Sequence, residues 1–223
     1  MKNDNTTPMN AREYDAQITK TIPYYSEFHA QTFSVIKNMD FEKITWLDLG
    51  CGTGTLASKA SHIFENVEFT MVDPSETMIE KAQENNLHLQ ATYLCASSDN
   101  IDFDSEFDVV TAIQSHHYMK EEARKKATEN IYRALRSDGI YITFENVIPE
   151  TEEIKELELQ RWGTYQKEHG KSEKEVEAHI ARCGVNYFPI TINQHIELLQ
   201  QVGFRNVHVF WYSYMQAGIY AMK

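Results

Sequence analysis

Three glycines within five positions, in the stretch LDLGCGTGTLA at residues 47–57, constrain this chain more than any other feature. They follow an apolar run and precede a stretch with helical character, which predicts a tight strand-to-helix turn with bare backbone. In dinucleotide-binding folds such a turn has the spacing G-x-G-x-x-G. Here the spacing is G-x-G-x-G, and Thr55 stands where the dinucleotide fingerprint requires its third glycine. The loop therefore indicates a related ligand that is not a dinucleotide.

Apolar runs alternate with helical patterns along most of the chain. Strands are predicted at 44–50, 67–73, 91–96, 107–114, 140–147, 206–213 and 215–223, the last two as a hairpin. Helices are predicted at 55–65, 74–85, 121–139 and 191–201. The third of these helices is expected to end at Gly139, because glycine is a frequent helix C-cap. This alternation predicts an α/β fold with a doubly wound, mostly parallel sheet, whose loops after each strand share one ligand-binding edge.

Two further segments lie outside the predicted sheet. Residues 12–38 show helical spacing broken by Pro23, and the chain is rich in Glu and Lys between Pro149 and residue 175. We expect one domain over residues 1–223, in which 1–40 form a helical lid and 150–190 a helical insertion that caps the substrate.

The composition excludes several functions. There are 21 Lys and Arg against 33 Asp and Glu, a formal charge of −12, which disfavours nucleic acid as a partner. No apolar run is long enough to span a bilayer, and the first residues lack the apolar core of a signal peptide. Three scattered cysteines show no metal-ligand spacing, so we expect no metal and a reducing cytoplasm. The sequence does not indicate an oligomeric state.

An acidic residue follows the glycine loop at the spacing seen in nucleotide-binding folds. Asp73 ends the second predicted strand, about 20 residues on, where such residues bind a ribose diol. A nucleoside ligand with a ribose but no pyrophosphate fits both the Asp and the missing third glycine. S-adenosylmethionine is such a ligand, and Asp48 is a candidate for orienting the loop and the ligand's ammonium group.

The stretches LDLGCGTG and VEFTMVDPSETMIEKA resemble the first two motifs of class I S-adenosylmethionine-dependent methyltransferases, and the resemblance covers roughly residues 44–147. It implies a Rossmann-like sheet of seven strands with an antiparallel C-terminal strand. It also implies a set of cofactor contacts: Gly50, Cys51, Gly52 and Gly54 at the methionine end, Asp73 at the ribose, and Pro74 and Met78 near the adenine.

The third motif departs from that pattern. Where many relatives carry an Asp that bonds the adenine amino group, this chain has Ser97, followed by Ser98. A hydroxyl accepts the same hydrogen bond more weakly. Asp99 is the alternative.

The segment AIQSHHYM follows the fourth predicted strand, so it lies at the ligand edge of the sheet. Gln114 is predicted to contact the cofactor, and His117 is the candidate catalytic base, because an imidazole titrates near neutral pH. The alternative is that one ring of the pair His116 and His117 is packed and the other exposed.

The N-terminal aromatic residues Tyr14, Tyr24 and Tyr25 are candidates for capping a sulfonium, whose charge attracts ring faces. An ordinary lid or core helix is the alternative.

Two segments, TIPYYSEF and residues 181–223, are similar to parts of carboxy-S-adenosylmethionine synthase, a family that converts S-adenosylmethionine and prephenate to a carboxylated cofactor. The similarity implies that Tyr25 contacts the cofactor and that Arg182 pairs with the added carboxylate, so both are candidate catalytic residues. The match fails at Ala112, where that family has asparagine, and in the GCGTG loop. We therefore expect common ancestry with a retained lid but not the synthase activity, and Arg182 is then a candidate for holding an acidic substrate.

The leading prediction is a cytoplasmic methyltransferase that uses S-adenosylmethionine and acts on a small molecule, one with an anionic group if Arg182 binds the acceptor. One alternative is a carboxy-S-adenosylmethionine synthase or a user of that cofactor. Another is a protein that binds S-adenosylmethionine without turnover.

Overall fold

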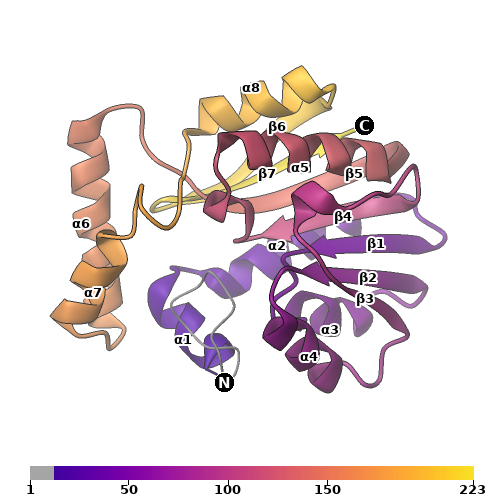
Figure 1. Ribbon diagram of the computed structural model, residues 1–223, viewed down its shortest axis with the longest axis horizontal. Coiled ribbons are helices and arrows are strands. Elements are labelled where there is room, and N and C mark those ends of the chain that lie inside the picture. Colours follow the sequence, from indigo (N-terminus) through magenta and orange to yellow (C-terminus); the bar gives the residue numbers. More distant parts are fainter. Residues whose placement is uncertain (1–12) are drawn as a thin grey trace.

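Seven strands form one sheet in the computed structural model, which describes residues 13–223 (Figure 1). They are β1 (Ile44–Leu49), β2 (Val67–Asp73), β3 (Ala91–Cys95), β4 (Phe107–Ile113), β5 (Leu135–Asn146), β6 (Arg205–Ser213) and β7 (Gln216–Met222). Their order is β3-β2-β1-β4-β5-β7-β6. The pairs from β3 to β5 are parallel, and β7 is antiparallel to β5 and to β6. The predicted Rossmann-like sheet with an antiparallel C-terminal strand is confirmed.

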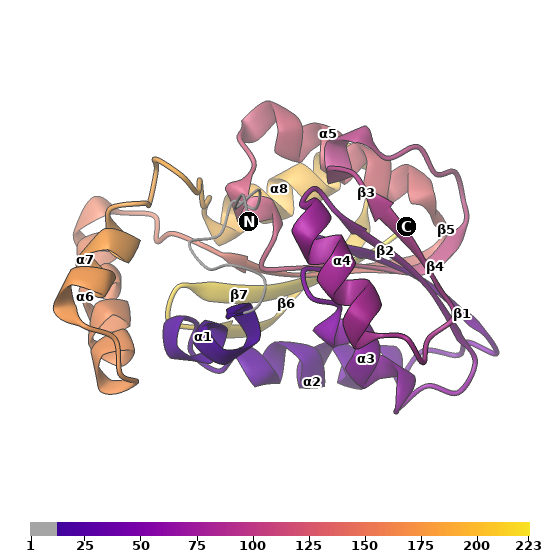
Figure 2. The same ribbon diagram turned by 60° about the horizontal axis from the view of Figure 1, so that its bottom comes forward.

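Helices cover both faces of the sheet. They are α1 (Tyr14–Thr21), α2 (Tyr25–Ile36), α3 (Thr55–Ser61), α4 (Glu76–Asn85), α5 (Glu121–Ala134), α6 (Glu152–Glu168), α7 (Glu173–Ile180) and α8 (Ile192–Val202), with short 3-10 turns η1 (Ser98–Asn100) and η2 (His116–Tyr118). Figure 2 shows α2 and α3 on one face and α5 and α8 on the other, while α6 and α7 stand beside the sheet.

Neighbouring residues of each strand supply the two cores, because side chains alternate between the faces of a sheet. Trp46 of β1 packs with the cluster under α2 and α3, and Leu47 packs with the cluster under α5 and α8. Both side chains are fully buried. Strand β1 is therefore apolar on both faces, as expected for a central strand in the middle layer of three.

The prediction that a helix ends at Gly139 is wrong. Helix α5 ends at Ala134, and Gly139 lies inside β5. A Cβ at Gly139 would lie 2.9 Å from Leu135 Cδ2 and 3.1 Å from the Asp108 carbonyl oxygen. Glycine is therefore required by close packing between β5 and β4, near the register shift in that pair.

Helix α1 connects the sheet to the helices beside it. The buried Trp162 of α6 donates from Nε1 to the Thr21 carbonyl at 2.7 Å, and the Tyr165 hydroxyl donates to the Thr19 carbonyl at 3.1 Å. Helix α2 packs on the sheet, where the rings of Phe28 and Phe144 stack at 4.5 Å. Of the predicted lid at 1–40, residues 1–12 lie outside the described residues.

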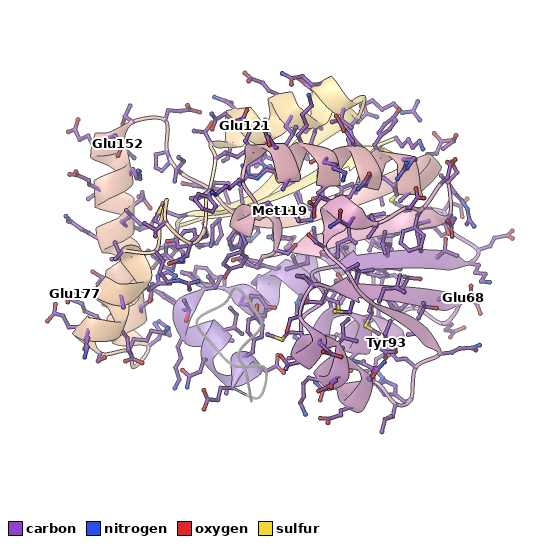
Figure 3. All side chains as sticks on the ribbon, viewed as in Figure 1. Glu68, Tyr93, Met119, Glu121, Glu152 and Glu177 are labelled. Carbon is purple, nitrogen blue, oxygen red and sulfur yellow. The ribbon has the colours of Figure 1, made fainter. Side chains whose placement is uncertain are left out.

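Acidic side chains are exposed at both ends of the molecule. Glu152 and Glu177 lie on α6 and α7, and Glu68 lies on β2 at the other end (Figure 3). Among residues 13–223, no helix combines the length and the apolar character needed to cross a bilayer.

Candidate functional site

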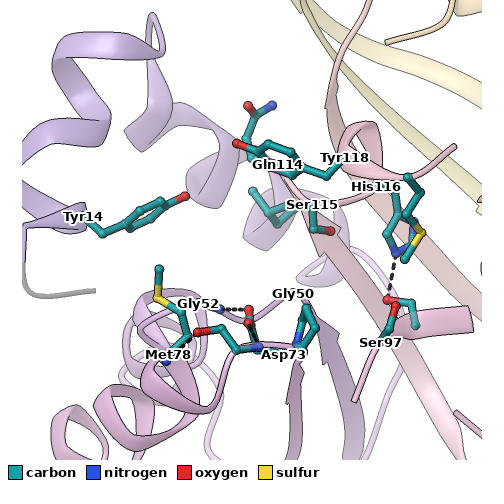
Figure 4. Close-up of a pocket in the computed structure, with 15 residues that line it drawn as sticks. Tyr14, Gly50, Gly52, Asp73, Met78, Ser97, Gln114, Ser115, His116 and Tyr118 are labelled. Carbon is teal, nitrogen blue, oxygen red and sulfur yellow. Dashed lines mark hydrogen bonds between the residues drawn. The ribbon is translucent and has the colours of Figure 1, made fainter. Parts of the chain in front are cut away.

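A cavity of about 290 Å³ opens at the carboxyl ends of β1, β2 and β4 (Figure 4). This is the edge at which open α/β sheets bind ligands. Its lining consists of Tyr14, Gly50, Gly52, Asp73, Pro74, Ser75, Met78, Ser97, Ser98, Ile113, Gln114, Ser115, His116, Tyr118 and Met119.

The floor of this cavity is the glycine loop. Gly52 has φ +54°, and a Cβ built there would meet no atom of the described residues within 4 Å apart from its chain neighbours. Its amide donates to Asp73 Oδ2 at 3.0 Å (Figure 4). Gly52 therefore presents bare backbone to open space, as a ligand cradle requires.

Gly54 has a different role in the same loop. It is the N-cap of α3 with φ +77°, and a Cβ there would lie 2.3 Å from Asn86 Nδ2. Gly54 therefore permits close packing of the loop on the C-terminal end of α4, and it does not line the cavity.

Asp73 organises the loop and the helix that follows. Its Oδ1 accepts from the Ser75 amide at 2.9 Å, and Ser75 Oγ accepts from the Met78 amide at 3.2 Å as the N-cap of α4. Met78 and Tyr14 face each other across the cavity (Figure 4). One carboxylate thus holds both the glycine loop and the entry to α4.

Helix α1 is attached to the glycine loop. Thr53 and Thr55 donate from Oγ1 to Asp15 Oδ1 at 2.9 and 3.1 Å. Tyr14, the next residue, lines the cavity, and its hydroxyl is hydrogen-bonded to that of Tyr25. Burial raises the pKa of both phenols, so both stay protonated at neutral pH. Tyr25 therefore supports Tyr14 from behind the lining.

Asp48 lies behind the loop in β1. Its Oδ1 accepts from Thr111 Oγ1 at 2.8 Å, and its buried Oδ2 has no hydrogen-bond partner among residues 13–223. Burial raises its pKa to about 7, with the Asp73 charge adding to that effect and the Thr111 hydrogen bond opposing it.

Asp48 makes stability depend on pH. The native state keeps its proton up to about pH 7, whereas an unfolded Asp releases it near pH 4. This contribution is therefore complete below about pH 4 and is lost as pH rises to 7, by at most about 1.4 kcal/mol per pH unit. Asp48→Asn is expected to remove that part of the slope. Urea unfolding of both proteins from pH 4.5 to 7.5 measures it, and parallel stability curves would contradict the assignment.

The segment after β4 forms the wall opposite the glycine loop. The backbone of Gln114 is in the left-handed region with φ +57°, which is uncommon for a residue other than glycine. Its backbone N–H donates to the Phe144 carbonyl at 2.7 Å. His116 Nε2 lies 3.1 Å from Ser98 Oγ, and Ser97 Oγ donates to Asp99. Burial lowers the pKa of His116, which favours the neutral ring.

A second cavity of about 30 Å³ adjoins the first and shares Tyr14, Gln114 and Tyr118 with it. Arg182 lines this smaller cavity. Burial raises the pKa of Tyr118 to about 12, although the Arg182 charge opposes that rise. A cationic side chain thus lies next to the larger cavity.

The structure brings most of the predicted cofactor residues together. Gly50, Gly52, Asp73, Pro74, Met78, Ser97, Ser98 and Gln114 line the larger cavity, whereas Tyr25, Asp48, Cys51, Gly54 and His117 lie outside its lining. The residues absent from the predicted set include Ser75, Ile113, Ser115, His116, Tyr118 and Met119. All of these except Ser75 lie between Ile113, the last residue of β4, and Met119. Their place at the carboxyl edge of the sheet is the sequence feature from which a ligand contact could be predicted.

Comparisons with known proteins agree with this geometry. Residues 47–139 match the family model described as a methyltransferase domain. A carboxy-S-adenosyl-L-methionine synthase of Nautilia profundicola is 26% identical over 200 residues, which is 89% of this chain and 86% of the relative. The same-named protein of Staphylococcus epidermidis is 27% identical over 226 residues, 96% of this chain and 93% of the relative.

A solved structure shows the same fold. It is a methyltransferase of Thermotoga maritima described as S-adenosylmethionine-dependent and as a possible histamine N-methyltransferase. The TM-score is 0.63 at 17% identity, with 95% of each chain covered. The sheet order, the cavity and these matches make the chain similar to class I S-adenosylmethionine-dependent methyltransferases, with the methyltransferase-domain match covering residues 47–139. The two carboxy-S-adenosyl-L-methionine synthases named above are similar to it along most of its length.

Proposed function

We propose that the larger cavity binds S-adenosylmethionine with its amino-acid end at Gly50 and Gly52, its ribose at Asp73 and its adenine near Met78 and Ser97. The open space beside Gly52 supports the first contact. Asp73 lines the same cavity and is held in place by the Gly52 and Ser75 amides, so a carboxylate is fixed at the proposed position of the ribose. When bound, the cofactor supplies a methyl group on a sulfonium, open to in-line displacement.

We further propose that the acceptor is a small molecule with an anionic group, held by Arg182 in the smaller cavity. This proposal is supported by the position of Arg182, which lines the smaller cavity, where Tyr14, Gln114 and Tyr118 are shared with the larger one. A guanidinium at this position attracts an anionic group on an acceptor that reaches it. A planar carboxylate suits the guanidinium fork.

Methyl displacement needs a positioned acceptor more than a protein nucleophile. Tyr118 and Tyr14 line both cavities and are placed to orient such an acceptor. The catalytic role of His117 stays a prediction: its ring lies 4.4 Å from that of Tyr118, and its Nδ1 bonds to Glu145. The cytoplasmic location belongs to the same proposal.

Arg182→Ala is expected to reduce turnover of carboxylate acceptors by about thirtyfold or more, the scale for removing one partner of a charge pair. S-adenosylmethionine affinity should change less than about threefold, because Arg182 does not line the larger cavity. The assay uses methyl-labelled cofactor with metabolites supplied as carboxylates and as their amides, and calorimetry gives the cofactor affinity.

Arg161→Ala is the matched control, because that arginine of α6 is exposed and bonds to Glu158 at 2.9 Å. Equal, small changes in turnover and in cofactor affinity for both variants would show that Arg182 does not bind the acceptor.

Carboxy-S-adenosylmethionine synthesis is the second candidate. It is favoured by similarity that covers 86% and 93% of the two relatives' lengths. Arg182 would then pair with a carboxylate on the cofactor itself. Mass spectrometry of the ligand retained by the purified protein distinguishes the two: a carboxylated cofactor supports the second candidate, and unmodified S-adenosylmethionine with labelled-methyl turnover supports the first.

A further inference from the structure

The turn η2 builds the place where the two cavities meet. His116 and Tyr118 come from this single turn, and both line the larger cavity. Tyr118 also lines the smaller cavity. A short 3-10 turn has few internal hydrogen bonds, so its position depends on the groups around it.

The amide side of the turn is held by one buried carboxylate. Glu145 of β5 is 1% exposed. Its Oε1 accepts from the His116 amide at 3.2 Å and from Thr143 Oγ1 at 2.8 Å. Its Oε2 accepts from the His117 amide at 2.8 Å and lies 2.9 Å from His117 Nδ1. Both oxygens are thus used to fix two consecutive residues of η2.

The carbonyl side of the turn is held by a buried cation. Arg124 of α5 is 4% exposed and donates from Nη2 to the Met119 carbonyl at 2.9 Å. The same atom donates to the Phe188 carbonyl. The His117 carbonyl accepts from the Phe188 amide at 2.6 Å, which ties η2 to the segment that follows Arg182.

The charge on Glu145 is maintained although the group is buried. Burial by itself raises a carboxyl pKa, but the hydrogen bond and charge interaction with His117, with smaller effects of His116 and His195, lower the pKa of Glu145 to about 2. Arg124 and Tyr141 also face it. The two backbone amides of η2 donate to this carboxylate, so these two bonds are charge-assisted.

We propose that Glu145 is a positioning residue, which acts through the η2 amides to hold Tyr118 and His116 against the cofactor cavity. His117 is then part of this support. The inference does not depend on the identity of the acceptor. It concerns the cofactor cavity, so its test reads cofactor binding and can fail independently of the Arg182 assignment.

The test is Glu145→Gln. An amide of the same shape keeps one acceptor oxygen, but its NH₂ group faces an N–H donor of the turn, so η2 must shift. We expect the Kd for S-adenosylmethionine, measured by calorimetry, to rise about tenfold or more, with a lower Tm. Ile131→Ala is the matched control, because Ile131 is a fully buried residue of α5 that lines neither cavity. At an equal loss of Tm, Ile131→Ala should leave the Kd within about threefold.

A double-mutant cycle with Tyr118→Ala tests the route of the effect. If Glu145 acts by placing Tyr118, the double variant loses less affinity than the product of the two single losses. Multiplicative losses would overturn the proposal. So would a Glu145→Gln Kd within threefold of wild type, or an Ile131→Ala loss as large as that of Glu145→Gln.

Discussion

Gly52→Val is expected to abolish detectable binding of S-adenosylmethionine while the protein stays folded. A Cβ at Gly52 meets no atom of residues 13–223 within 4 Å apart from its chain neighbours, so the side chain starts in open space and projects toward the space needed by the ligand. The positive φ of +54° adds backbone strain, which lowers Tm without unfolding the sheet. Thermal unfolding with and without S-adenosylmethionine is the measurement.

Gly170→Val is the matched control. Gly170 also has a positive φ, +91°, and no described atom lies within 4 Å of its Cβ position apart from its chain neighbours, but it follows the C-cap of α6 and lines neither cavity. This variant should show the strain alone and keep full stabilisation by S-adenosylmethionine. Ligand stabilisation that survives in Gly52→Val would show that the glycine loop is not the site.

Asp73→Ala is expected to weaken S-adenosylmethionine binding by about 1.5–3 kcal/mol, or roughly tenfold to 150-fold in Kd, the scale of hydrogen bonds to a charged group. The loss has two sources: the ribose contact, and the support that Asp73 gives to the Gly52 and Ser75 amides. Calorimetric titration gives the Kd directly.

Asp108→Ala controls for lost stability. Like Asp73, Asp108 accepts a hydrogen bond from a backbone amide of another segment, that of Thr45 in β1, at 2.8 Å. It lies near the start of β4 and does not line the cavity. Partial burial raises the pKa of Asp108, but the hydrogen bonds from Thr45 and the nearby Arg136 charge outweigh it and hold that pKa below the ordinary value. If Asp73→Ala keeps wild-type affinity, the ribose assignment is wrong.

The sheet and the floor of the site could be predicted because local sequence determines them. Each strand is an apolar run between polar turns, and the loop from Gly50 to Gly54 needs positive φ at three positions, a requirement that only glycine meets at low cost. Asp73 follows from its distance along the chain, because parallel strands end at a common edge.

The walls of the site could not be predicted in the same way, because contacts between distant segments place them. Tyr118 has no motif, and its position depends on Glu145, 27 residues later in the chain, through the amides of η2. His117 has the chemistry of a base, but only the fold shows that its Nδ1 is used by Glu145. Gly139 looked like a helix cap because its steric contacts with β4 are invisible in sequence.

The placement of β7 between β5 and β6 has a consequence for synthesis. The nascent chain completes β6 before β7, yet in the described sheet β6 pairs with β7 and not with β5. Until residues 216–222 have left the ribosome, β6 has no pairing strand and the edge of β5 stays open. Unpaired edges of partly made sheets associate readily with other chains. Loss of β7 would therefore leave β6 without a pairing strand and one edge of β5 open, while β5 keeps its pairing with β4.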